Sequence, residues 1–392
     1  MLKIKDVATL TGLIQATKEM SLGTCAGIDG VDLKQFWINL QTTDLGNEII
    51  ESLTKGTYFP QPLFKVCIPK PNGTTRDIFI PTVQDRAIQR MVVEGLRTTT
   101  ELRFLNQSFG FRPERNTQQA ILTASQLVKE GFKVCVLIDL ENFFGNIDRE
   151  RLRKLLRDYD IDGGLRGLIN QFIKAPITGG NEEQMQTGIP AGIPLAPLLA
   201  NIYLHPLDRE LNRMGIKFVR YADDITLFFK TEDDCQIFLN GFWGICEKKF
   251  RICINRQKTK VINQGQRPIL GFELGDYGGI MPRPGMVDAV QRFLVGLLAD
   301  PFPPLIEILR QVRGRVTSTL SYYKCIDDFE GFKNAFEEVQ EGIRQRLLKY
   351  TKLEILSAAG VKLARLEDHE DHSEYDALLK ILPPVNNIYD NR

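Results

Sequence analysis

The feature that most constrains this chain is a pair of adjacent aspartates in an apolar stretch. Between Phe218 and Phe229, β-branched and aromatic residues flank Asp223 and Asp224, which predicts a strand, a tight turn and a second strand. An ordinary hairpin is one interpretation, because Asp is common in turns. However, Ala222 and the two aspartates suit a two-residue turn poorly, since such turns prefer Gly or Asn at positive φ. The two carboxylates also repel, and each raises the other's pKa unless a cation lies nearby.

A third carboxylate follows another apolar run. Residues 134–138 read as a buried strand, and Asp139 comes directly after them. On neighbouring strands, Asp139, Asp223 and Asp224 would form an all-oxygen site suited to Mg²⁺. Two such ions can activate a 3′-hydroxyl and stabilise a leaving pyrophosphate in an in-line displacement. The three aspartates therefore predict the chemistry of a nucleic-acid polymerase.

With these motifs in order, the chain resembles the reverse transcriptases, specifically the bacterial group II intron-like branch. The resemblance runs from about Gly27 to Phe272 and rests on a series of ordered blocks, since a Tyr-x-Asp-Asp string alone is weak. It implies an α+β right-hand polymerase with fingers, a palm of antiparallel sheet and helices, and a helical thumb. The implied domains are 1–137 for the fingers with part of the palm, 138–281 for the palm with the catalytic motifs, and 282–392 for the thumb with an acidic C-terminal segment.

The same resemblance implies the catalytic residues and their cofactor. It assigns catalysis to Asp139, Asp223 and Asp224, and metal binding to these three together with Leu140. The implied cofactor is a pair of Mg²⁺ ions, for which Mn²⁺ can substitute.

A hairpin is predicted around the Pro-Asn-Gly sequence at residues 71–73. Lys70 and Arg76 straddle this turn, so that together they can reach a triphosphate, Arg as a fork and Lys as a point charge. A solvated hairpin tip would carry such charges as well. The resemblance favours the first interpretation, because in the family this fingers hairpin closes over the incoming nucleotide.

Two further positions resemble the family's nucleotide contacts. Phe144 matches an aromatic steric gate that blocks a ribose 2′-hydroxyl, and Lys258 matches a Lys-Thr block near the triphosphate. The alternative for Phe143 and Phe144 is that both belong to the core. We expect one of them there, since adjacent residues on an extended segment face opposite ways.

A Gly/Pro-rich loop at residues 188–197 leads into a buried helix. The family usually has Gln-Gly followed by Ser-Pro here, whereas this chain has Ala191-Gly192 and Ala196-Pro197. In the family the Gln touches the incoming sugar and base. Ala191 and Gly192 are therefore expected at the nucleotide, with altered nucleotide selection.

Candidate nucleic-acid contacts come from four arginines. Arg112 and Arg115 resemble family positions near the template strand, although a local salt bridge with Glu114 is an alternative for them. Arg310 and Arg313 lie on a predicted helix, away from most of an apolar stripe at helical spacing. We interpret that helix as part of a thumb that contacts the minor groove of a template–product duplex. A helical bundle with an ordinary solvated face is the alternative. The apolar stripe consists of Leu305, Ile308, Leu309, Val312 and Val316.

The segment 367–376 is strongly acidic, with six carboxylates in ten residues. His369 and His372 lie among them at i, i+3 and could bind a metal. A solvated acidic segment or an element for docking or self-association are the other interpretations.

Composition limits the remaining choices. The 392 residues carry a net charge of +1, so a nucleic-acid-binding groove requires clustered basic residues. The seven cysteines form no C-x-x-C pair, which argues against a disulfide framework or zinc ribbon and predicts a reducing cytoplasm. The sequence has no apolar run near the ~20 residues that span a bilayer and does not open on a signal peptide, so we expect no membrane partner.

The predicted function is RNA-templated DNA synthesis from dNTPs. The short chain, the altered Ala191 block and the lack of endonuclease or maturase modules resemble stand-alone bacterial reverse transcriptases of antiphage defence, which act with a cognate non-coding RNA. A diversity-generating or other retroelement reverse transcriptase is an alternative, a retron enzyme being less favoured. An RNA-dependent RNA polymerase and a catalytically silent RNA-binding protein on this fold are further alternatives. The sequence is compatible with a homo-oligomer and with a monomer.

Overall fold

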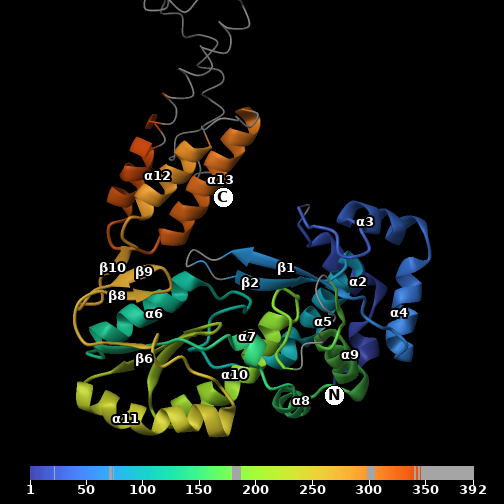
Figure 1. Cartoon of the computed structure of the whole chain (residues 1–392), viewed down its shortest axis with the longest axis horizontal. Coiled ribbons are helices and arrows are strands. Elements are labelled where there is room, and N and C mark those ends of the chain that lie inside the picture. The colour runs from blue at the N-terminus through green and yellow to red at the C-terminus, as the bar shows by residue number, and fades with distance from the viewer. Residues whose placement is uncertain are drawn as a thin grey trace, which may run out of the picture. The chain divides into compact units, whose positions relative to one another are not determined.

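The chain forms two compact units in a computed structural model, which describes residues 1–21, 23–69, 73, 75–178, 187–297, 305–339, 341–342 and 345, with backbone only for 305–309. The first unit comprises Met1–Asn116 and Gly131–Asn263 (Figure 1). The second combines Thr117–Glu130 with the chain from Gln264 onward. Helices and antiparallel sheet occur together, so the α+β class predicted from the sequence is confirmed.

The centre of the first unit is a four-stranded sheet with the strand order β5-β6-β3-β7. Its strands are β3 (Val134–Ile138), β5 (Lys217–Tyr221), β6 (Asp224–Phe229) and β7 (Lys260–Ile262), and every neighbouring pair is antiparallel. Ile138 at the end of β3 pairs with Ile225 near the start of β6. This register brings Asp139 to the same edge of the sheet as the β5–β6 turn.

Helices make up most of the rest of the unit, and the first four of them form its N-terminal part. They are α1 (Ile4–Val7), α2 (Leu10–Lys18), α3 (Leu33–Thr42), α4 (Leu45–Lys55), α5 (Val83–Glu101), α7 (Phe143–Asn146), α8 (Arg149–Arg157), α9 (Gly163–Ile173), α10 (Ala196–Arg213) and α11 (Glu232–Gly244), with α11 continuing into the π-helix η1 (Ile245–Phe250). Polar N-cap side chains start many of them: Thr82, for example, accepts a hydrogen bond from the Asp85 N–H at the start of α5. Helix α10 is buried along most of its length and carries residues that hold the β5–β6 turn.

A smaller sheet lies beside this core, with the order β2-β1-β4. Strands β1 (Leu63–Pro69) and β2 (Thr75–Ile80) form the predicted antiparallel hairpin, and β4 (Ile177–Thr178) pairs in parallel with β1. The Phe79 N–H donates to the Ala191 carbonyl at 2.8 Å. This hydrogen bond attaches the hairpin to the Gly/Pro-rich loop that precedes α10.

The second unit contains a small antiparallel sheet and several helices. Its elements are α6 (Thr117–Lys129), β8 (Arg267–Ile269), β9 (Phe272–Leu274), β10 (Ile280–Pro282), α12 (Met286–Gly296), α13 (Leu305–Tyr323) and a helical stretch at 329–339. Five aromatic rings of this unit contact one another, four of them buried and Tyr322 partly exposed: Phe272, Tyr322, Tyr323, Phe332 and Phe336.

The apolar stripe predicted on α13 is confirmed at the two positions whose side chains the structure describes. Val312 and Val316 are buried on α13, whereas Arg310 and Arg313 are exposed on the same helix. The acidic segment 367–376 lies outside the described residues. In the described ranges, no helix has both the length and the apolar character that crossing a bilayer requires.

A buried carboxyl group organises the start of α5. Asp85 is 1% exposed and accepts hydrogen bonds from Tyr58 Oη at 2.6 Å, Thr82 Oγ1 at 3.0 Å and the Gln61 N–H at 3.0 Å. Burial raises the pKa of Asp85, although these hydrogen bonds act in the opposite direction. The network joins the segment before β1 to α5.

We expect Tyr58→Phe to lower the free energy of unfolding by about 1–3 kcal/mol, because it removes a donor from a buried carboxyl group. Tyr159→Phe is the matched control, since Tyr159 is also buried but its Oη has no hydrogen-bond partner within the described residues. Urea denaturation of both variants checks this. Equal losses in the two variants would contradict the assignment.

Candidate active site

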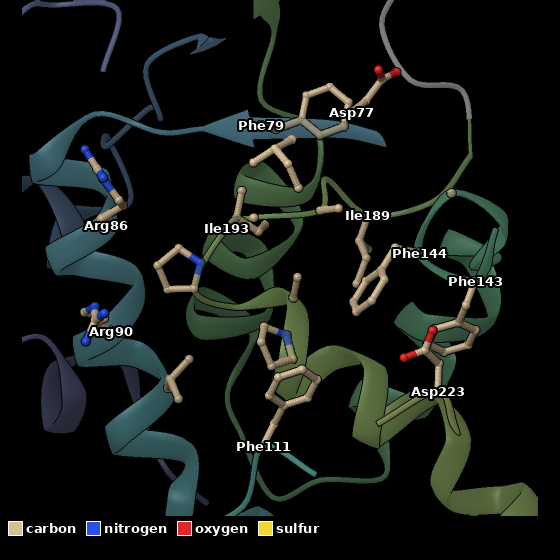
Figure 2. Close-up of a pocket in the computed structure, with 18 of the residues that line it drawn as sticks. Asp77, Phe79, Arg86, Arg90, Phe111, Phe143, Phe144, Ile189, Ile193 and Asp223 are labelled. Carbon is tan, nitrogen blue, oxygen red and sulfur yellow. The ribbon is translucent and has the colours of Figure 1, made fainter. Parts of the chain in front are cut away.

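A large cavity opens in the first unit beside the edge of the four-stranded sheet (Figure 2). It encloses about 1940 Å³, and Asp139 and Asp223 both line it. The cavity walls come from the β1–β2 hairpin, α5, the loop before α10 and the segment after β3. Two of the three predicted carboxylates therefore face one space, and Asp224 directly follows Asp223.

The turn between β5 and β6 has a strained backbone. Tyr221 pairs with Asp224, so Ala222 and Asp223 are the two turn residues. Ala222 has φ +58°, a conformation that residues with a Cβ atom rarely adopt. The tight hairpin therefore forms despite its unfavourable sequence, and such strain commonly marks functional sites.

The strained turn is packed against a second backbone segment. A Cβ atom on Gly110 would lie 2.3 Å from the Ala222 nitrogen, so only glycine permits this approach. The Gly110 carbonyl accepts a hydrogen bond from Asn201 Nδ2 at 2.9 Å, which ties the segment to α10. The turn is thus enclosed by backbone that cannot move without breaking buried contacts.

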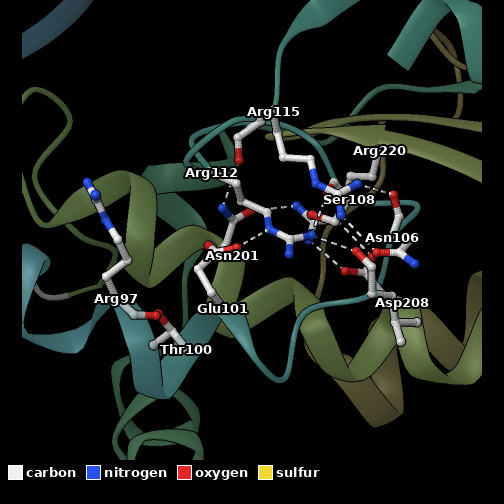
Figure 3. Close-up of polar contacts among 12 residues, drawn as sticks. Arg97, Thr100, Glu101, Asn106, Ser108, Arg112, Arg115, Asn201, Asp208 and Arg220 are labelled. Carbon is white, nitrogen blue, oxygen red and sulfur yellow. Dashed lines mark hydrogen bonds and ion pairs between the residues drawn. The ribbon is translucent and has the colours of Figure 1, made fainter. Parts of the chain in front are cut away.

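A fully buried arginine holds the same turn from inside the protein (Figure 3). The Arg220 guanidinium donates to both Asp208 carboxylate oxygens at 2.8 and 2.6 Å, and neither side chain is exposed. Its Nη1 also donates to Asn201 Oδ1 at 2.8 Å and to the Ala222 carbonyl at 3.0 Å. Arg220 therefore joins α10 directly to the backbone of the turn that presents Asp223.

Asp139 is fixed through its backbone. Its carbonyl accepts from the Asn255 N–H at 2.8 Å, and its own N–H donates to Thr259 Oγ1 at 3.3 Å. Leu140, the next residue, forms an isolated antiparallel bridge with Ile254. Because the hydrogen bonds of that bridge involve the flanking residues, the Leu140 carbonyl points away from Ile254.

The three carboxylates carry negative charge that the described residues do not neutralise. No hydrogen bond or ion pair reaches the side chains of Asp139, Asp223 or Asp224 from any described residue. Partial burial, together with the charges of Asp223 and Asp139, raises the pKa of Asp224 to about 6. A divalent cation would reverse this effect, because it favours the ionised carboxylates.

The donor set fits Mg²⁺ in part. Carboxylate and carbonyl oxygens are its preferred ligands, and Mg²⁺ at such sites is usually held by one or two carboxylates with substrate phosphates and water. Among the residues that the structure describes, no three acidic, thiol or imidazole side chains form a complete ligand cluster. Asp139, Asp223 and Asp224 are therefore not gathered into a preformed three-carboxylate metal site in this structure.

The predicted nucleotide contacts gather around the cavity. Arg76, Phe144, Ala191, Gly192 and Lys258 all line it, whereas Lys70 lies outside the described residues. Gly192 has φ +105°, and a Cβ atom there would lie 3.0 Å from the Phe79 carbonyl. The loop that carries Ala191 and Gly192 is thereby pressed against β2.

The segment that follows Asp139 differs from the expected extended conformation. Phe143 and Phe144 belong to the short helix α7, so the alternation argument for their directions was wrong. Phe143 is buried and Phe144 is half-buried, with the two rings in edge contact at 5.5 Å between centroids. The Phe143 ring is in the core, so one of the two rings is buried as expected. The reason is the helical geometry of α7 and not the alternation of a strand.

The two predicted template arginines make local contacts (Figure 3). Arg112 is 8% exposed and donates to Glu101 at 2.9 Å and to two backbone carbonyls. Its salt-bridge partner is therefore Glu101 and not Glu114. Arg115 is half-buried and donates to Asn106 Oδ1 at 2.8 Å. Arg112 would have to break buried contacts to reach a phosphate.

Two residues of the site were not identified from the sequence. Arg220 lies in a strand pattern in which its partners on α10 cannot be recognised. Phe111 lines the cavity and is 53% exposed, with φ +59°. The only sequence signal was its position between Gly110 and Arg112.

The fold and the cavity define a class of protein: a template-directed polymerase with its acidic site at the edge of an antiparallel palm sheet. Comparison with known proteins agrees. Residues 68–274 match the family described as "Reverse transcriptase (RNA-dependent DNA polymerase)". Because this match spans more than half of the chain, the protein belongs to the reverse transcriptase family, whose members are RNA-directed DNA polymerases.

Relatives in bacteria place it in the group II-like branch. The chain is 28% identical to Protein YkfC of Escherichia coli over 282 residues, covering 61% of this chain and 73% of YkfC. It is 37% identical to the group II intron-encoded protein LtrA of Lactococcus lactis over 179 residues, covering 45% of this chain and 30% of LtrA. It is 30% identical to the Retron Mx162 reverse transcriptase of Myxococcus xanthus, covering 41% of this chain and 34% of that protein. The matches thus span about a third of the latter two proteins.

We expect Arg220→Met to lower the free energy of unfolding by about 3–5 kcal/mol, because Asp208 would remain buried without a counter-charge. The double variant Arg220→Met/Asp208→Leu should recover most of that loss, since a buried ion pair can be replaced by apolar side chains. Urea denaturation measures both. Arg213→Met is the control, because Arg213 pairs with Glu210 on the surface and little change is expected.

Nucleotide incorporation separates stability from positioning in the same variants. The double variant still lacks the donor to the Ala222 carbonyl. Its incorporation rate should therefore remain about a hundredfold below that of the wild-type protein, which is the loss that an ångström-scale misplacement causes. Full activity in the stable double variant would show that Arg220 does not position the turn.

Proposed function

We propose that this chain copies RNA into DNA by two-metal nucleotidyl transfer at Asp139 and Asp223, with Asp224 in support. The observation that carries the proposal is the set of three unpaired carboxylates at one edge of the sheet, two of them lining the cavity. Asp139, Asp223, Asp224 and the Leu140 carbonyl are the protein groups that would hold Mg²⁺, or Mn²⁺ in its place. Divalent cations supply charge stabilisation to the attacking and leaving oxygens when bound at such a site.

Residues on the cavity walls would contact the triphosphate, the sugar and the base of the incoming nucleotide. Arg76 and Lys258 are exposed cationic side chains that would bind the triphosphate, and Lys70, which lies outside the described residues, is the third candidate. Phe144 would limit space at the sugar, and so select dNTPs. Ala191 and Gly192 would contact the nucleotide mainly through backbone, because neither has a long side chain.

Other parts of the chain have proposed roles that follow the family. Residues 1–137 would form the fingers with part of the palm, 138–281 the palm, and 282–392 the thumb with the acidic segment. Arg310 and Arg313 would contact the template–product duplex, and Arg112 or Arg115 the template, with Arg115 favoured because it is less buried than Arg112. Every described residue assigned to nucleotide binding belongs to the first unit.

The proposed template is a cognate non-coding RNA, copied in the bacterial cytoplasm as part of antiphage defence. The similarity to a retron reverse transcriptase and to a group II intron-encoded protein supports this proposal. A diversity-generating or other retroelement reverse transcriptase is the second candidate, favoured by the 37% identity to LtrA. A silent RNA-binding protein would have no need for three unpaired carboxylates.

Sequencing the RNA that co-purifies with the protein, and supplying labelled dNTPs or NTPs with Mg²⁺ to the same sample, tests this proposal. We expect one dominant small RNA and a product that requires dNTPs. The Asp223→Asn variant should bind the same RNA and unfold at the same temperature, yet incorporate nothing, because its amide cannot supply the second anionic ligand.

The outcomes separate the alternatives. Incorporation by Asp223→Asn would refute the metal assignment. Products made from NTPs alone would identify an RNA-dependent RNA polymerase. Heterogeneous RNA without any incorporation by the wild-type protein would favour the silent RNA-binding protein.

We expect Phe144→Ala to admit ribonucleotides, because it removes the ring proposed to exclude the 2′-hydroxyl. Relief of a steric conflict worth about 1–3 kcal/mol corresponds to about a 5- to 140-fold shift in the ratio of rNTP to dNTP incorporation. Single-nucleotide extension with each sugar measures it. Phe143→Leu is the control on the same helix, and should leave the ratio unchanged.

A further inference from the structure

Phe111 combines two properties that a structural residue would not need. Its φ of +59° is strained for an aromatic residue, and its side chain is 53% exposed. Burial therefore does not compensate fully for the strain. The ring lies instead on the wall of the catalytic cavity (Figure 2). Exposed, strained residues of this kind are candidates for ligand binding.

The protein holds the Phe111 backbone firmly on both sides. Gly110 is pressed against the Ala222 nitrogen, and its carbonyl accepts a hydrogen bond from Asn201. Arg112 is buried and anchored by Glu101 and by the carbonyls of Leu105 and Ser108. A ring presented from such a fixed support loses little conformational entropy when a flat ligand stacks on it.

Cationic side chains line the same cavity. Arg86 and Arg90 on α5 both line it, although Arg86 already donates to the carbonyls of Thr82 and Cys25. Figure 2 shows Phe111 on the side of the cavity away from the β2 residues Asp77 and Phe79. Arg90 is exposed and has no hydrogen bond or ion pair with any described residue. An aromatic surface with nearby arginines is the combination that binds single-stranded nucleic acid, base on ring and phosphate on guanidinium.

We propose that Phe111 is a stacking platform for one base of the unpaired template strand, next to the catalytic turn. The inference rests on the proposed function for the identity of the strand. The incoming nucleotide is assigned to Phe144, Ala191 and Lys258, none of which belongs to α5 or to the segment of Phe111, which leaves these two elements to the template. Phe111 is then a specificity and positioning residue that holds the template base in register with Asp223.

Equilibrium binding of an RNA template annealed to a labelled DNA primer, without nucleotide, tests the proposal. Phe111→Asn removes the ring, and Asn adopts positive φ readily. Its affinity for the intact template should fall about 5- to 140-fold, the range for loss of one base–aromatic stack. An abasic residue is then placed at each unpaired template position in turn. When the abasic residue replaces the base that stacks on Phe111, the wild-type and Phe111→Asn proteins should bind that template with equal affinity.

Stability and a conservative variant distinguish stacking from a structural role. The thermal midpoint of Phe111→Asn should equal or exceed that of the wild type, whereas Phe111→Trp should retain template affinity. Phe59→Asn is the matched control, because Phe59 is 73% exposed and does not line the cavity. It should bind both templates as the wild type does.

Two results would contradict the assignment of Phe111 as a stacking platform. An affinity loss that is the same for intact and abasic templates at every position would show a structural effect. A raised KM for dNTPs with unchanged template binding would assign the ring to the incoming nucleotide. Because binding is measured without catalysis, absence of incorporation by the wild-type protein would count against the proposed function and not against stacking.

Discussion

The candidate active site depends on one buried ion pair. Arg220 and Asp208 are both fully buried, and their two hydrogen bonds offset the cost of removing two charges from water. The remaining guanidinium donors reach Asn201 and the Ala222 carbonyl. The strain at Ala222 is therefore maintained by interactions in the interior, and the cavity side of the turn is left for Asp223. A strained turn that carries two adjacent carboxylates needs such external support.

Close backbone contacts extend this support around the cavity. Gly110 lies against the turn, Gly192 against β2, and a Cβ atom on Gly188 would come within 2.5 Å of the Gly145 carbonyl. Each contact replaces a side chain with direct backbone packing, so the loops that form the walls have little freedom to shift. This rigidity suits a site where geometry, more than any single interaction, controls the reaction.

Much of this arrangement could be predicted from the sequence because it is local. Asp139 follows an apolar strand, and Asp223 and Asp224 interrupt another, so antiparallel pairing alone brings them to one edge. The partners of Arg220 could not be predicted, since Asp208 and Asn201 are on a helix whose rotation the sequence does not reveal. Charge was equally misleading at Arg112, because the sequence shows a cation but not its buried partner Glu101. Of the two neighbouring residues, Phe111 is exposed and Arg112 is buried.

The route of the chain between the two units has a consequence for biosynthesis. Helix α6 belongs to the second unit, although it is translated in the middle of the first, and the remainder of its unit begins only at Gln264. Its face of Ala120, Ile121, Ala124 and Val128 is buried in the finished protein. The buried Ser125 hydroxyl of the same helix donates to the carbonyl of Gly278, a partner that is synthesised 153 residues later. A chain that ended near residue 263 would lack this partner and the rest of the second unit, and incompletely packed segments of this kind are prone to aggregation.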